Sequence, residues 1–244
     1  MQTPLAKTPR SLLLDTYRGS AVLLMIVFHF CWDLRNFGFI EYHLFDPFWV
    51  HFRSLILTLF FTAIGWSAYV SHMSPSKGLS RTKAFYRRDG KLLICALGIS
   101  LATYLAAPQQ WIYFGILHFI FLASILIRPF LSTPVVASFI GTGVIVCYYY
   151  TPYLHFPNAF HTITQHIPLP SRTLDIVFPF PWIGVVLLGP LLGFVKLHQC
   201  TVPDHPIIRF MALLGRHALP IYLLHQLFLF AFVASAKTVL DYLL

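Results

Sequence analysis

Charged residues are scarce in this chain. They make up only 10% of its 244 residues, against about 25% in an average soluble domain. Apolar residues make up 57%, and the mean hydropathy is +0.72. This composition excludes a soluble globular domain and a disordered chain. A membrane-spanning helix needs about 20 mostly apolar residues, so a chain of this length has room for roughly six to eight spans.

Cysteine is also rare, and its spacing is uninformative. The four cysteines lie far apart with no CxxC pair, and three of them fall inside apolar runs (Cys31, Cys95, Cys147). This pattern indicates neither a disulfide-stapled module nor a zinc site. In the segment near residue 160, His155, His161 and His166 have irregular spacing and no acidic or cysteine companions. We therefore expect no metal cofactor.

Acidic residues are few as well. There are 8 Asp and Glu against 17 Lys and Arg and 12 His, which gives a formal charge of +9. The basic residues fall in loops beside apolar runs, where they indicate orientation in a membrane. We accordingly expect the basic residues to lie beside a lipid bilayer and not to bind nucleic acid.

The apolar runs predict an all-α fold, a polytopic helix bundle forming a single integral-membrane domain over residues 1–244. Pro, Gly or polar clusters punctuate the ends of the runs. The seven expected spans are Leu12–Phe37, Pro47–Ser71, Lys91–Ala107, Trp111–Pro129, Pro134–Thr151, Ile176–Leu197 and Leu219–Leu243.

The distribution of Lys and Arg predicts a cytoplasmic N-terminus. With seven spans, most basic residues fall in inner segments, whereas the outer loops hold Glu41, Asp46 and Asp175 and only Arg35 and Arg172 in opposition. This agrees with the positive-inside rule. The inner basic residues are Lys7, Arg10, Lys77, Arg81, Lys83, Arg87, Arg88, Lys91, Arg128, Lys196, Arg209 and Arg216.

The first expected helix carries four ionisable residues, Asp15, Arg18, His29 and Asp33. Such residues inside a membrane indicate function by default. His29 lies eleven positions after Arg18, which places both on one helix face, about 16 Å apart along the axis. We expect a polar stripe with a cationic inner end and a His/Asp outer end.

Three histidines are candidates for chemistry or ligand binding. His29 and Asp33, at i and i+4, can form a base and its orienting carboxylate, or simply a polar contact between helices. His118 is expected at a depth similar to that of His29, as a catalytic or a packing residue. His225, with Gln226, is expected at the depth of Arg18, where it lines a ligand channel or bonds Asp15.

The basic stretch that precedes the third expected span resembles a phosphate-binding surface. Alternatively, this stretch is an ordinary cytoplasmic loop whose basic residues follow the positive-inside rule and attract anionic lipid. Its candidate ligand-binding residues are Arg81, Lys83, Arg87 and Arg88.

Three blocks of sequence resemble one membrane family, that of the catalytic domain of heparan-alpha-glucosaminide N-acetyltransferase. They are Asp15-Thr-Tyr-Arg18-Gly19 followed by His29-Phe-Cys-Trp-Asp33-Leu, then Phe114-Gly115-Ile-Leu-His118, and finally Leu214-Gly-Arg-His-Ala-Leu-Pro-Ile-Tyr-Leu-Leu-His225-Gln226. The spacing from Arg18 to His29 is also similar to that of membrane enzymes that O-acetylate bacterial polysaccharides.

The resemblance implies an acyltransferase of the bacterial inner membrane. Acetyl-CoA would be the cosubstrate on the cytoplasmic side, and a saccharide or glycoconjugate hydroxyl or amine would be the acceptor at the outer face. It implies that His29 handles the acceptor and the acyl group and that Arg18 lines the coenzyme A path. It also allows a homodimer.

The chain departs from these families at two points. In the lysosomal branch the active histidine lies in the loop before the second helix, which makes His43 the reserve candidate for the catalytic histidine. The polysaccharide enzymes carry Arg-x-x-Arg on a later cytoplasmic segment, where this chain has Arg88-Asp-Gly-Lys91.

Two other functions compete with acyl transfer. A b-type membrane cytochrome would bind haem through His29, His118 and His225, because haem takes two histidines at matching depth. A proton-coupled transporter would use Asp15, Arg18 and His29 as a relay. The short chain, without a visible inverted repeat, counts against a transporter.

Overall fold

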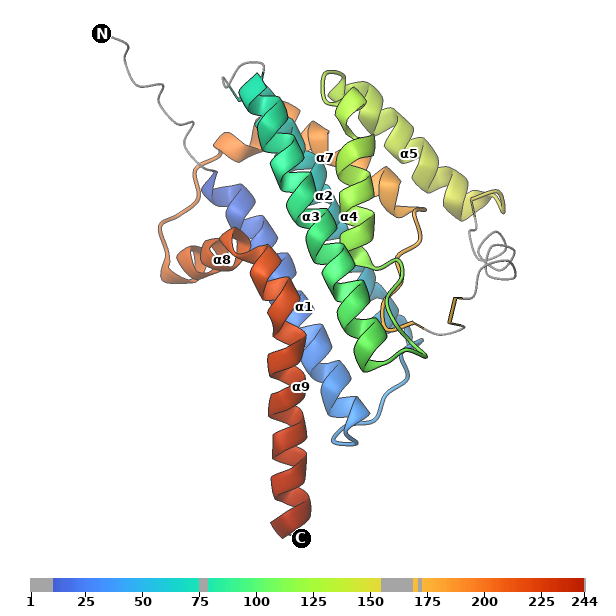
Figure 1. Ribbon diagram of the computed structural model, residues 1–244. Coiled ribbons are helices and arrows are strands. Elements are labelled where there is room, and N and C mark those ends of the chain that lie inside the picture. The colour runs from blue at the N-terminus through green and yellow to red at the C-terminus, as the bar shows by residue number, and fades with distance from the viewer. Residues whose placement is uncertain (1–10, 75–78, 155–168, 171–172, 244) are drawn as a thin grey trace. The chain divides into compact units, whose positions relative to one another are not determined.

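The computed structural model describes residues 11–74, 79–154, 169–170 and 173–243, without the side chains of residues 79–81. These residues form helices and no strands (Figure 1). The helices are α1 (Leu12–Asn36), α2 (Pro47–Met73), α3 (Leu79–Ala106), α4 (Ile116–Leu126), α5 (Pro134–Tyr150), α7 (Trp182–Phe194), α8 (Pro206–Arg216) and α9 (Ala218–Leu243), with short 3-10 turns at Arg128–Phe130 and Leu197–Gln199.

The chain divides into two compact units. One contains residues 11–60 and 199–244, and therefore α1, α8, α9 and the first half of α2. The other contains residues 61–198, with the second half of α2 and helices α3, α4, α5 and α7.

In the first unit, α8 packs on α1 with almost no space between the two backbones. A Cβ atom added at Gly19 of α1 would collide with the backbone of Met211, and one added at Gly215 of α8 would collide with the Asp15 carbonyl. Glycine at both positions thus permits the close approach of the helices.

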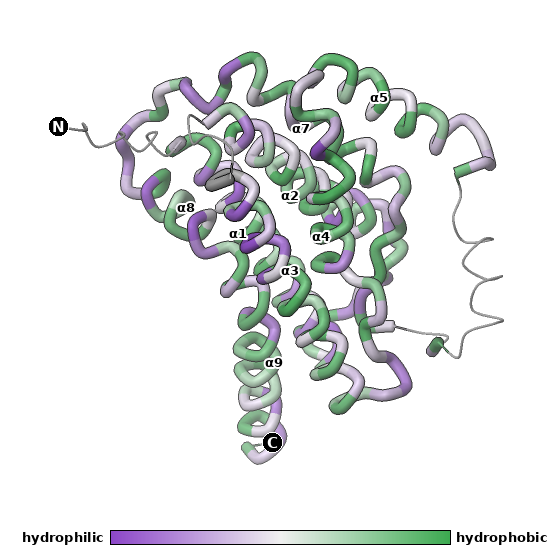
Figure 2. The backbone as a smooth tube through the Cα atoms, turned by 45° about the horizontal axis from the view of Figure 1, so that its top comes forward, coloured by the Kyte–Doolittle hydropathy of each residue, from purple (hydrophilic) through white to green (hydrophobic). Residues whose placement is uncertain are grey.

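Helix α9 lies beside α1 and runs parallel to it (Figure 1). The order of their contacts establishes the direction, because His29 meets His225 and the later residue Asp33 meets Gln226. A small apolar core between α1 and α2 is formed by Val22, Met25, Phe28 and Ile56. Figure 2 shows that α9 is hydrophobic along most of its length, and much of it is exposed.

In the second unit, glycines again mark where helices meet. Gly141 of α5 and Gly184 of α7 face each other's backbone, and Gly65 of α2 faces Gly189 of α7. Asp89 of α3 accepts a hydrogen bond from Ser124 of α4 (2.9 Å) and forms an ion pair with Arg128 in the 3-10 turn that follows α4.

Each of the seven predicted spans contains a helix, but only four of the described helices have the length and hydropathy to cross a membrane alone. These are α1, α2, α3 from Thr82 and α9, whereas α4, α5 and α7 are shorter apolar helices. A charged N-terminal extension makes α3 begin at Leu79 instead of Lys91. Helix α7 begins at Trp182 instead of Ile176, after two prolines, which cannot donate backbone hydrogen bonds.

Candidate functional site

His29 sits in the second half of α1 with one ring nitrogen already engaged. Its Nδ1 lies 2.9 Å from the carbonyl oxygen of Met25, one turn earlier. A carbonyl only accepts hydrogen bonds, so Nδ1 carries the proton, and Nε2 is the basic nitrogen of the neutral ring. The helix backbone thereby fixes the tautomer of His29 and leaves Nε2 unprotonated.

His225 of α9 is the ring partner of His29. The two rings meet edge to face, with centroids 4.7 Å apart and planes at 81°. The Nδ1 atom of His225 donates to the carbonyl of Tyr222 (2.8 Å), and its Nε2 is buried without a hydrogen-bond partner. The prediction that His225 lies at the depth of Arg18 is therefore wrong, because it lies at the depth of His29.

Asp33 pairs with α9 and does not pair with His29. Its Oδ1 accepts a hydrogen bond from Gln226 Nε2 at 2.8 Å. Within the described structure, the partner of His29 Nδ1 is the Met25 carbonyl, so the expected His29–Asp33 hydrogen bond is not formed. Gln226 therefore contacts Asp33, whereas the sequence predicted that it lies near Asp15.

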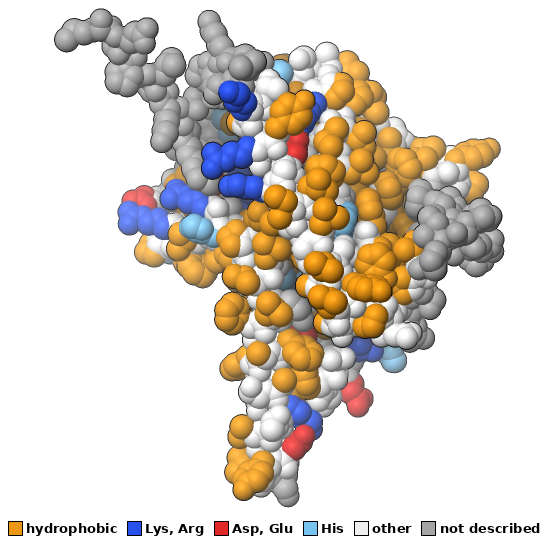
Figure 3. Space-filling model, viewed as in Figure 1, with side chains coloured by type: hydrophobic (Ala, Val, Ile, Leu, Met, Phe, Trp, Pro, Cys, Tyr) orange, Lys and Arg blue, Asp and Glu red, His pale blue; other side chains and the backbone are white. Residues whose placement is uncertain are grey.

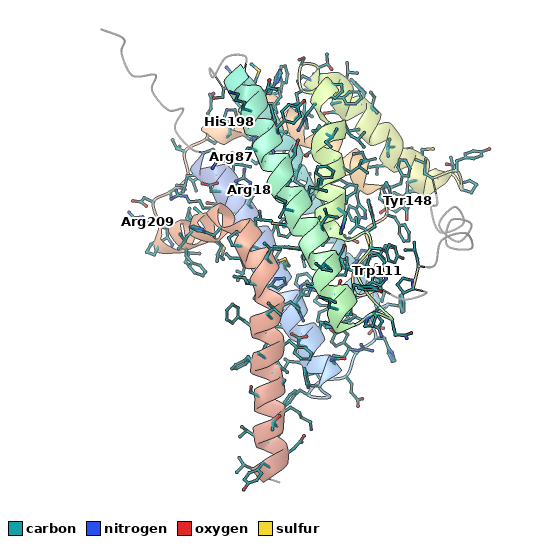
Figure 4. The ribbon with its side chains drawn as sticks, viewed as in Figure 1. Arg18, Arg87, Trp111, Tyr148, His198 and Arg209 are labelled. Atoms are coloured by element: carbon teal, nitrogen blue, oxygen red, sulfur yellow. The ribbon has the colours of Figure 1, made fainter. Side chains whose placement is uncertain are left out.

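Two arginines share Asp15 near the start of α1. This carboxylate, only 2% exposed, lies 3.1 Å from Arg18 Nη1 and 3.2 Å from Arg216 Nε. Arg18 is labelled in Figure 4. Two cations against one acid leave a net positive cluster, which suits an anionic ligand. Sequence reasoning assigned Arg216 only to membrane orientation, and its contact with Asp15 spans 201 residues.

His118 has both ring nitrogens occupied by groups of its own unit. Its Nδ1 accepts a hydrogen bond from the backbone N–H of Gly115 (3.2 Å), so Nε2 carries the proton and faces Ser100 Oγ at 3.1 Å. Ser100 in turn donates to the Ile112 carbonyl. These contacts fasten the α3–α4 connection, which gives His118 a structural role.

The predicted phosphate-binding residues lie in the first turns of α3. Lys83, Arg87 and Lys91 are exposed, and Arg88 is half-buried, whereas the side chain of Arg81 lies outside the described residues. In Figure 4, Arg87 lies toward the first end of α3 and Trp111 lies beside the second half of this helix, where its ring contacts Tyr104. Figure 3 shows Lys and Arg side chains gathered near this first end.

The reserve candidate His43 lies exposed in the loop between α1 and α2, and its backbone N–H donates to Asp46 (3.2 Å). The neighbouring Tyr42 stacks on Trp49, with ring centroids 4.1 Å apart. Burial raises the pKa of Tyr42 above that of a free tyrosine. His43 therefore lies in the loop and is not part of the ring contact between His29 and His225.

The His29–His225 pair does not suit haem. Two imidazoles that bind one iron from opposite sides direct their nitrogens at each other across the metal, whereas these rings meet edge to face. In the described part of the chain, no group of three or more His, Cys, Asp or Glu side chains is arranged to hold a metal ion. His155, His161 and His166 lie outside the described residues.

The chain matches one known protein family. Residues 10–227, which include α1, the His118 block and the start of α9, match the family described as heparan-alpha-glucosaminide N-acetyltransferase, catalytic. No curated protein and no solved structure matches the chain. Four of the described helices are long and apolar enough to cross a membrane, which together with the family makes this an integral membrane protein. The resemblance predicted from the three sequence blocks is confirmed: the chain belongs to the heparan-alpha-glucosaminide N-acetyltransferase catalytic-domain family of membrane acetyltransferases.

Proposed function

We propose that this protein transfers an acetyl group from cytoplasmic acetyl-CoA to a saccharide hydroxyl or amine at the outer face of the bacterial inner membrane. The observation that carries the proposal is the half-buried His29, whose Nδ1 is held by Met25 and whose Nε2 is left as the base. Family membership supports acetyl transfer as the chemistry.

In the proposed reaction, His29 Nε2 takes the proton of the acceptor as its oxygen or nitrogen attacks the thioester carbonyl. The carbon–sulfur bond then breaks, and the proton passes to the departing sulfur to give free coenzyme A. In an alternative order, Nε2 itself attacks the thioester, the carbon–sulfur bond breaks and coenzyme A leaves as its thiolate. The acceptor then attacks the acetyl group on the ring, which releases the imidazole, and the acceptor's proton passes to the thiolate. His225, in ring contact with His29, would line the same chamber.

The coenzyme A phosphates require a cationic surface at the opposite end of the path. Arg18, partly exposed beside Asp15, would line this path. The phosphates would bind among the basic residues of α3, for which Arg81, Lys83, Arg87 and Arg88 remain the candidates. Exposure of Lys83 and Arg87 supports this assignment, because a ligand can reach them.

The direction of α9 supports a seven-span topology with a cytoplasmic N-terminus. Helices α1 and α9 run parallel, as the first and last of an odd number of spans must do. The shorter α4, α5 and α7 would serve as the remaining crossings between α3 and α9. Non-helical backbone at their ends is tolerated in a membrane where other parts of the protein bury it.

The test uses purified protein in nanodiscs with radiolabelled acetyl-CoA and a panel of mono- and oligosaccharides. Wild type is expected to bind acetyl-CoA and transfer the label. His29→Ala is expected to bind acetyl-CoA but to transfer about 10²–10⁴-fold more slowly, as loss of a general base predicts. His51→Ala is the matched control, because His51 is exposed on α2.

Each result bears on a different part of the proposal. Acetyl transfer at the wild-type rate by folded His29→Ala would refute the role of His29, and His43→Ala would then be the next variant. Failure of the wild type to bind acetyl-CoA would refute the donor. Flux of a solute into proteoliposomes without acetyl-CoA would favour the transporter instead.

A further inference from the structure

The carboxyl group of Asp33 is buried in a way that does not suit a negative charge. The residue is 1% exposed, and its Oδ1 accepts one hydrogen bond, from Gln226 Nε2. Its other oxygen, Oδ2, is buried without a hydrogen-bond partner. A charge held this way costs several kcal/mol or more unless it is paired.

Other aspartates of this protein show how the chain stabilises a carboxylate. Buried Asp15 contacts Arg18 and Arg216, and buried Asp89 contacts Arg128. The exposed Asp204 and Asp241 are also paired, with Arg209 and Lys237 respectively. In the parts of the chain that the structure describes, Asp33 has no cation within ion-pair distance.

The surroundings of Asp33 offer no substitute for a cation. Asp33 lies in the last turn of α1, where the partial negative charge of the helix end disfavours an anion. Arg35 is engaged elsewhere, because its Nε donates to the Tyr42 carbonyl at 2.7 Å. Tyr42 interacts electrostatically with Asp33, but its buried hydroxyl makes no hydrogen bond.

Gln226 also has a buried acceptor that lacks a hydrogen-bond donor. Its Nε2 donates to Asp33, but its Oε1 is buried without a hydrogen-bond partner. The pair thus contains two unsatisfied acceptors, and a single proton on Asp33 Oδ2 supplies the donor that both lack.

We infer that Asp33 is a neutral carboxylic acid that forms a reciprocal pair with Gln226, in which Gln226 Nε2–H donates to Oδ1 and Oδ2–H donates to Gln226 Oε1. This pair fixes α9 against α1 at the residue next to His225. Gln226 is thereby a positioning residue that keeps the His225 ring against His29. This role in catalysis rests on the proposed acetyl transfer, whereas the protonated pair itself does not.

The first test is spectroscopic and independent of activity. The infrared difference spectrum between wild type and Asp33→Asn at neutral pH is expected to contain a protonated-carboxyl C=O band that the variant lacks. Asp241→Asn, which removes an exposed carboxylate from α9, is the control and is expected to change only carboxylate bands. Absence of the protonated band from the Asp33 difference spectrum would overturn the inference.

The second test separates positioning from charge. Asn at position 33 can make both hydrogen bonds to Gln226, so Asp33→Asn should keep kcat within about threefold of wild type. Asp33→Leu and Gln226→Leu replace the polar group by a branched apolar one and break the pair, and each should lower kcat about tenfold or more with an unchanged KM for acetyl-CoA. Equal losses in Asp33→Asn and Asp33→Leu would overturn the positioning role.

If wild type transfers no acetyl group, the proposed function fails while the pair remains testable. Thermal unfolding would then replace kcat as the second readout. Asp33→Asn should unfold near the wild-type temperature, and both leucine variants should unfold well below it. Unfolding of Asp33→Asn at the temperature of the leucine variants would again overturn the pair.

Discussion

The rings of His29 and His225 lie edge to face, with centroids 4.7 Å apart, although 196 positions separate the two residues. Each ring donates its Nδ1 proton to a carbonyl of its own helix, to Met25 on α1 and to Tyr222 on α9. The backbone therefore assigns the same tautomer to both rings. Two neutral imidazoles, each with Nε2 as its basic nitrogen, thus share one site.

The substitution His225→Phe distinguishes the role of the ring nitrogen Nε2 from the role of the ring in packing. Phenylalanine retains an aromatic ring against His29 but lacks Nε2, which is buried and unpaired in His225. We expect kcat for acetyl transfer to fall about tenfold or more, while the unfolding temperature stays near that of wild type. A folded His225→Phe protein with wild-type kcat would show that His225 contributes packing alone.

The helices were largely predictable from the sequence, because long apolar runs in a charge-poor chain require a membrane. Their ends were less predictable. The prediction began α3 at Lys91, whereas the structure begins it at Leu79, since basic residues are good helix formers outside the apolar run. Helix α8 was not predicted from the sequence, because it has only 11 residues and is amphipathic, with an apolar face and an opposite polar face.

The sequence predicted the positions of the site residues within α1, but it did not predict which residues of α9 contact them. Helical periodicity correctly places His29 and Asp33 one turn apart on α1. Their partners come from α9, and the Asp33–Gln226 bond joins residues 193 positions apart. The register of α9 on α1 is a long-range packing relationship, which local periodicity does not encode. This explains why His225 was assigned to the wrong depth.

Asp15→Asn should change stability and coenzyme A binding in opposite directions. The substitution removes the negative charge that Arg18 and Arg216 share. Both arginines are partly exposed, so solvent screening limits the loss of stability to about 1–3 kcal/mol. If Arg18 lines the coenzyme A path, loss of the negative charge of Asp15 should strengthen coenzyme A binding, measurable by isothermal titration.

The control for Asp15→Asn is Asp204→Asn, which breaks an exposed ion pair with Arg209. Its unfolding temperature should match that of wild type. Weaker coenzyme A binding in folded Asp15→Asn would contradict the assignment of Arg18 to the coenzyme A path. Higher salt should reduce any gain in affinity, because screening weakens the attraction between Arg18 and a phosphate.

Gly19→Ala should disrupt the contact between α1 and α8. The added methyl group collides with the backbone of Met211, which cannot rotate away as a side chain can. We expect a loss of about 3 kcal/mol in the free energy of unfolding. Gly98→Ala is the control, because nothing lies within 4 Å of a Cβ atom there. It should be neutral or stabilising by up to about 1 kcal/mol.

His118→Ala should lower stability and leave the chemistry of the folded protein intact. The substitution removes an acceptor for the Gly115 N–H and the partner of Ser100 Oγ, a loss of about 1–3 kcal/mol for groups left unsatisfied. Ser100→Ala breaks the same network from the other side and should lower the unfolding temperature in the same direction. The kcat of each variant, corrected for its folded fraction, should stay within about threefold of wild type. A selective fall in kcat for His118→Ala, absent from Ser100→Ala, would instead give His118 the catalytic role that its position in the sequence first indicated.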